Sequence, residues 1–133
     1  MISHESLQAA SLLDPRLDSC GTGLREVDDM TPAGKQDAEL KFGPGQLRYY
    51  VMCIRHHPQP ITAMTRHLQA TQCLSSAESR PFWMLLAAPN TQGPVLDASA
   101  AWLLKLNPGE GIKLHLGTLS LIHISEPTRL GFI

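Results

Sequence analysis

From residue 43 onward, short apolar runs alternate with turn-forming Pro, Gly and Asn residues. This spacing is typical of an all-β sandwich or small barrel. The first run, residues 47–55, carries apolar side chains at both odd and even positions, so it predicts a central strand with both faces covered. The segment His56-His57-Pro58-Gln59-Pro60 ends that run, because proline cannot donate a hydrogen bond to a strand ladder.

Four further extended segments follow from the same pattern, at residues 61–67, 70–74, 81–88 and 112–116. In the last of these, apolar side chains alternate with Lys and His, which predicts a strand with one buried and one polar face. Residues 97–106 fit a helix by composition and a strand by the alternation near their end. We interpret them as a short turn of helix followed by a strand.

The chain divides into three parts by its composition and its pattern of apolar residues. Residues 1–42 mix Gly, Asp, Pro and Ser, so they predict an irregular N-terminal arm with a short helix at residues 6–13. Residues 43–118 form the predicted β domain, and residues 119–133 form a tail considered below. There is no internal repeat or heptad pattern, which excludes solenoids and coiled coils.

Composition narrows the function classes. Eleven Lys and Arg residues against twelve Asp and Glu residues give a net charge of −1, and no basic run is present, so nucleic acid is not an expected partner. No apolar stretch is long enough to cross a bilayer, and the start lacks a signal peptide, so we expect a cytoplasmic protein without a membrane partner. The three cysteines are odd in number and are expected to be reduced.

Candidate chemistry is concentrated in two places. Arg66-His67 precedes Thr71-Gln72 by a few residues, and Lys113 and His115 share the polar face of a later strand. If the chain closes into a barrel, these side chains can line one cavity suited to a small oxyanion. The alternative, that these polar faces contact solvent, stays open. No Cys-x-x-Cys pair, Walker loop or Gly-x-Ser-x-Gly elbow is present, which argues against several large enzyme classes.

The tail resembles something other than a protein sequence. Residues 119–129, Leu-Ser-Leu-Ile-His-Ile-Ser-Glu-Pro-Thr-Arg, match without a gap the translation of a transposase-type sequencing adapter, and Leu130-Gly131-Phe132-Ile133 fits the frame that follows it. We therefore expect a natural protein that is truncated after Thr118 and continues into residues absent here. For the same reason we expect residues 119–124 to be β-rich without being selected to pack, and burial to be poor beyond Arg129.

Several segments resemble the ureidoglycolate lyase family, also called ureidoglycolate hydrolase-type proteins. The resemblance covers residues 37–118; its more specific parts are Arg66-His67, Thr71-Gln72-Cys73-Leu74 and Gly111-Ile112-Lys113-Leu114-His115-Leu116-Gly117-Thr118. In the family, Trp-His follows the Gly-Thr pair, whereas Leu119-Ser120 stands here. The departure coincides with the start of the adapter-like tail.

The resemblance implies a cupin-like double-stranded β-helix, commonly dimeric, that cleaves ureidoglycolate to glyoxylate and urea in allantoin catabolism. Under this hypothesis His67 or His115 is the acid/base, Lys113 or Arg66 pairs with the substrate carboxylate, and Gln72 binds the ureido group. No cofactor is implied, and without the His-x-His of metal-binding cupins the sequence gives no argument for a metal. This particular chain is then an inactive fragment. The alternative is a cupin-like module that binds a small acid without turning it over.

Overall fold

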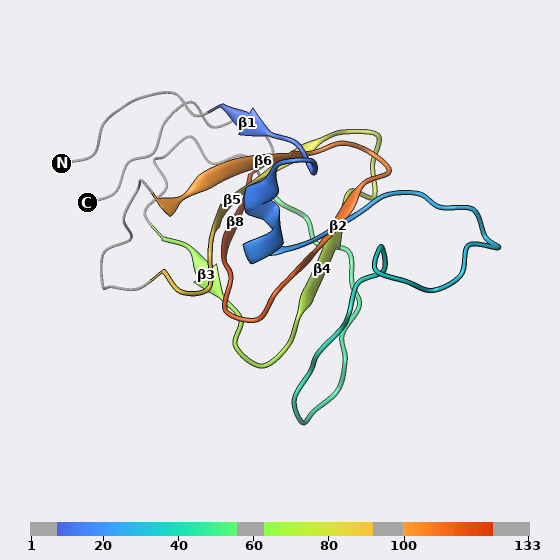
Figure 1. Cartoon of the computed structure of the whole chain (residues 1–133). Coiled ribbons are helices and arrows are strands. Elements are labelled where there is room, and N and C mark those ends of the chain that lie inside the picture. The colour runs from blue at the N-terminus through green and yellow to red at the C-terminus, as the bar shows by residue number, and fades with distance from the viewer. Residues whose placement is uncertain (1–7, 56–62, 92–99, 124–133) are drawn as a thin grey trace.

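The computed structural model describes residues 8–55, 63–91 and 100–123, which form two β-sheets packed as a sandwich (Figure 1). The larger sheet has the order β1-β6-β5-β8-β3, with strands β1 (Ala9–Ala10), β3 (Thr65–Arg66), β5 (Phe82–Ala87), β6 (Trp102–Leu106) and β8 (Leu119–His123). The smaller sheet has the order β2-β7-β4, with strands β2 (Gly21–Leu24), β4 (Gln72–Ser75) and β7 (Gly111–Leu114). The predicted all-β class is confirmed.

The core lies between the sheets and is built by strand alternation. Met84 and Leu86 on β5, with Leu104 and Leu106 on β6, meet Ile112 and Leu114 of β7 across the sandwich, and the six side chains are between 0 and 3% exposed. Burial of each large apolar side chain contributes about 1.5–3 kcal/mol. These inward faces therefore hold the two sheets together.

The predicted strand over residues 47–55 is wrong. Within the described residues this segment pairs with no strand, and Tyr49 is 99% exposed. Residues 41–43 lie instead beside the segment that leads into β4: Thr71 donates to the Lys41 carbonyl at 2.8 Å, and Phe42 bridges Ala70. The chain then turns away at Gly45, whose φ of 123° few other residues adopt.

The prediction of an irregular arm is wrong for residues 8–24. β1 pairs in parallel with β6, and β2 pairs antiparallel with β7 along its whole length. Between them lies η1 (Pro15–Ser19), a 3-10 turn that is capped by Asp14. The short helix predicted at residues 6–13 is replaced, in its described part, by β1 and a turn.

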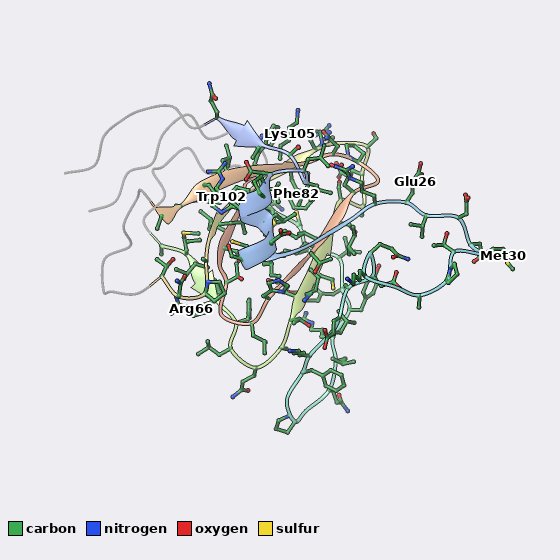
Figure 2. The ribbon with its side chains drawn as sticks, in the orientation of Figure 1. Glu26, Met30, Arg66, Phe82, Trp102 and Lys105 are labelled. Atoms are coloured by element: carbon green, nitrogen blue, oxygen red, sulfur yellow. The ribbon has the colours of Figure 1, made fainter. Side chains whose placement is uncertain are left out.

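The loop after β2 fits the predicted irregular texture. Residues 25–42 carry no strand other than the bridge at Phe42, and Glu26 and Met30 project away from the sandwich in Figure 2. No helix in the described ranges is long and apolar enough to cross a membrane.

The start of the tail forms a strand in the structure. β8 lies between β5 and β3, in the sheet opposite β7, with Ser120 6% exposed (Figure 1). Gly117, at a φ of 85°, turns the chain from β7 toward β8. The expectation that residues 119–124 are not selected to pack concerns their origin; of these residues, Leu119–His123 lie within a sheet. The prediction for residues beyond Arg129 lies outside the described residues.

We predict that Gly21→Ala destabilises the protein by about 1–3 kcal/mol, because a Cβ at Gly21 would clash with the carbonyl oxygen of Lys113. Gly43→Ala is the matched control. Its Cβ would meet the Gln69 carbonyl oxygen at an ordinary 3.6 Å, so its effect should stay within about 0.5 kcal/mol. Urea unfolding of both variants measures this, and equal stabilities would contradict the described pairing of β2 with β7.

Candidate functional site

Lys113 and His115 come together at the end of β7. They lie two residues apart on the face opposite Ile112 and Leu114, and Lys113 Nζ is 2.9 Å from His115 Nδ1. Lys113 is only 5% exposed although its neighbour on the strand, Ile112, faces the core. The ammonium group of Lys113 therefore lies against the imidazole of His115 with little access to water.

The N-terminal segment holds the other side of His115. The ring Nε2 lies 3.2 Å from the carbonyl oxygen of Asp18, and the backbone N–H of His115 donates to the carbonyl of Cys20 at 2.8 Å. Thr118 Oγ1 donates to the same Cys20 carbonyl, also at 2.8 Å. Residues 18–20 therefore fix both the ring and the backbone of His115.

These contacts select one tautomer of His115. The ammonium of Lys113 has only N–H groups to offer, so Nδ1 must accept, and the Asp18 carbonyl has only lone pairs, so Nε2 must carry the proton. Both bonds are made only by neutral imidazole protonated at Nε2. A second proton could enter only at Nδ1, where the lysine already donates.

The electrostatics act in the same direction. Burial lowers the pKa of His115 below its ordinary value of 6.5, the nearby charge of Lys113 lowers it further, and the bond to the Asp18 carbonyl only partly opposes them. His115 is therefore neutral near pH 7. A neutral imidazole is the form that acts as a general base.

Gln72 lies on the wrong face of its strand for this pair. In the β4–β7 ladder Gln72 stands opposite Leu114, so it shares the inner face with that side chain, whereas Lys113 stands opposite Cys73. Burial raises the pKa of the Cys73 thiol, and the charge of Lys113 opposes that rise. The structure therefore places Cys73, and not Gln72, beside Lys113.

Arg66 and His67 contact the turn that follows β7, but they bond only to its backbone groups and not to Lys113 or His115. The Arg66 guanidinium donates to the carbonyls of Gly117, at 2.9 Å, and Thr91, and the Gly117 N–H donates to the His67 carbonyl at 2.8 Å. Arg66 thus ties β3, at the far edge of the larger sheet, to the turn after β7 (Figure 2). The His67 side chain is exposed and makes no hydrogen bond to another described residue.

A hollow of about 480 Å³ beside η1 and β2 reaches His115, and no pattern in the sequence analysis predicted it. Charged side chains in its wall include Asp18, Arg25 and Lys35. All three come from the segment that we interpreted as an irregular arm. The signal that could have revealed it is the run Cys20-Gly21-Thr22-Gly23-Leu24, whose small and apolar residues are compatible with a short strand.

Among the described residues, no three His, Cys, Asp or Glu side chains come together as a metal site would require. No protein-family model matches the chain, and no curated protein matches it significantly.

We predict a pH-dependent contribution of His115 to stability. Because the folded pKa lies below 6.5, the unfolded chain takes up a proton first. The contribution is therefore fully present above pH 6.5 and is lost as the pH falls through the folded pKa. Urea unfolding of the wild type and His115→Gln between pH 8 and 5 tests this. The stability difference between the two proteins should shrink toward low pH, and a constant difference would contradict the assignment.

Proposed function

We propose that this chain derives from an enzyme of the ureidoglycolate lyase type, which cleaves ureidoglycolate to glyoxylate and urea. The observation that carries the proposal is the 2.9 Å contact between Lys113 and His115. Both residues belong to residues 111–118, one of the segments in which the resemblance to that family is more specific. The all-β sandwich is compatible with a cupin-like member of the family, and cupin topology is part of the proposal.

The chemistry needs two proton movements. The hydroxyl of the carbinolamide loses its proton as its carbon–oxygen bond becomes a carbonyl, the carbon–nitrogen bond breaks, and the departing urea nitrogen gains a proton. Neutral His115 supports both steps, since Nδ1 can take the hydroxyl proton and then return it to the urea nitrogen. Nε2 stays bonded to the Asp18 carbonyl throughout, which keeps the ring in place.

Lys113 is the better partner for the substrate carboxylate. Its ammonium has three N–H groups, of which one serves His115. The Arg66 guanidinium is already engaged by two backbone carbonyls. A carboxylate that draws the ammonium toward itself also frees Nδ1 for its role as a base. The predicted roles of His67 and Gln72 have no such support, because neither side chain contacts the pair.

A specific observation favours a second function, the cupin-like module that binds a small acid without cleaving it. Both ring nitrogens of His115 are engaged, one by Lys113 and one by Asp18. If the lysine does not move when a carboxylate binds, His115 cannot act as a base. Ligand-induced stabilisation by ureidoglycolate without release of urea would favour this second function.

The origin of the tail belongs to the proposal. We infer that residues 119–133 are translated adapter and that family residues once followed Thr118, which would make this chain an inactive fragment. Sequencing the source DNA across codons 115–133 tests this directly. An adapter-free genomic copy that encodes Leu119-Ser120 in the same frame would contradict it.

We predict that a chain with family residues following Thr118 releases urea and glyoxylate in equal amounts from ureidoglycolate. His115→Gln should lower kcat by about a hundredfold or more, because it removes the acid/base, while Lys113→Met should chiefly raise KM. His67→Gln is the matched control, an exposed histidine whose loss should change kcat less than twofold. Wild-type rates in both histidine variants would overturn the assignment.

A homodimer is also proposed, and an exposed apolar segment supports it. Leu47, Tyr49 and Val51 are between 69 and 99% exposed, and with Tyr50 and Met52 they form an apolar run without a strand partner among the described residues. Aromatic side chains such as Tyr49 and Tyr50 can bury about 150–250 Å² each. Tyrosine and methionine are also among the residues enriched at protein interfaces.

We predict that sedimentation of the full chain shows a dimer that the double variant Tyr49→Ser, Val51→Ser converts to monomer. The control is the double variant Leu13→Ser, Met30→Ser, which removes two similarly exposed apolar side chains, at 76 and 88%, elsewhere on the surface. A monomeric wild type, or equal effects of the two double variants, would exclude this surface as the interface.

A further inference from the structure

The hollow beside β2 carries features that the proposed cleavage does not use. β2 is the outer strand of the smaller sheet in the described part of the chain, and the hollow of about 480 Å³ lies against Gly21, Thr22 and Gly23. Its volume is in the range of small-molecule sites. Leu12, Leu13 and Leu17 contribute apolar surface to the same hollow.

The register shows which backbone groups of β2 face away from β7. The His115 N–H bonds to the Cys20 carbonyl, so this pair is a hydrogen-bonded one, and antiparallel pairs alternate along the ladder. Thr22 and Leu24 therefore bond to β7, whereas the N–H and C=O groups of Gly21 and Gly23 point to the free edge. No described residue bonds to these outward groups, although Gly21 is buried. A buried backbone group without a partner is uncommon.

Positively charged side chains line the same hollow. Arg25 and Lys35 line it together with a single carboxylate, that of Asp18. Arg25 makes a long ion pair, with its Nε 3.8 Å from Oε2 of Glu110. The other carboxylate oxygen of Glu110, Oε1, accepts the Asn107 N–H at 2.9 Å in the turn before β7. The two terminal nitrogens of Arg25 are thus available for a carboxylate, which a guanidinium binds in bidentate fashion.

We propose that this hollow binds a small carboxylate that also carries an amide-type N–H and C=O. The N–H and C=O of a trans amide point in opposite directions, so the ligand's amide N–H donates to an outward carbonyl of Gly21 or Gly23, and its carboxylate lies between Arg25 and Lys35. A short apolar side chain of the ligand packs on the leucines. This binding goes beyond the proposed activity, since it takes place at β2 and needs no cleavage step. His115 only lines the hollow and has no chemical role in it.

The test is a titration of the full ¹⁵N-labelled chain with N-acetylglycine, followed by NMR. We expect the amide signals of Gly21 and Gly23 to shift. Acetate, which lacks the amide, and N-methylacetamide, which lacks the carboxylate, should each bind at least about tenfold more weakly. Unshifted glycine signals, or equal affinity for acetate, would overturn the proposal.

Variants separate specific binding from a general effect of charge. Arg25→Ala should weaken binding of N-acetylglycine about fivefold or more. The matched control is Arg80→Ala, since Arg80 also approaches a glutamate, Glu78, at 3.8 Å but lies outside the hollow. Equal losses in the two variants would overturn the proposal. If N-acetylglycine binds as expected while ureidoglycolate is not cleaved, the proposed activity fails and this inference stands.

Discussion

The pairing of β7 on both of its edges is the constraint on which the rest of the structure depends. With β2 on one side and β4 on the other, the strand cannot shift by one residue without exchanging its two faces. Such a shift would expose Ile112 and Leu114 and force Lys113 into the core. Because each buried apolar side chain contributes about 1.5–3 kcal/mol, the register is well defined. The contact between Lys113 and His115 follows from it.

Residues 18–20 supply the remaining hydrogen bonds that hold His115 in place after β7. The carbonyl of Cys20 accepts hydrogen bonds from both His115 and Thr118, and the carbonyl of Asp18 accepts one from the imidazole. These bonds join parts of the chain about a hundred residues apart. The ring orientation, its tautomer and its lowered pKa thus depend on a segment that carries no catalytic side chain of its own in the proposed mechanism.

The sequence predicted the elements whose signals are local. The apolar run of β5 and the alternation of β7 gave both strands to within about two residues at each end, and the two-residue spacing of Lys113 and His115 placed them on one face. The strand predicted at residues 47–55 failed, because a strand needs a partner, and the nearby residues that find one are 41–43, which bridge the segment just before β4. The propensity of a segment does not show whether it finds a partner strand.

The same limit explains the errors at the site. Gln72 was grouped with Lys113 on the expectation that a closed barrel turns both side chains into one cavity, but the face that Gln72 occupies depends on its register against β7. Arg66 was grouped as an anion partner by residue type, but the carbonyls of Thr91 and Gly117 engage its guanidinium. The hollow beside β2 was missed because its residues come from a stretch without clear periodicity. Pairing and backbone contacts between distant segments are not visible in local patterns.

His115 is neutral, protonated at Nε2, and held between Lys113 and the Asp18 carbonyl. Long-range ¹H–¹⁵N NMR spectra of the histidine rings at pH 7 test it most directly, with His115→Gln used to assign the signals. We expect one fixed tautomer with the proton on Nε2 and an accepting Nδ1, and a loss of that preference in Lys113→Met. A ring protonated on Nδ1, or one that exchanges freely between tautomers in the wild type, would contradict it.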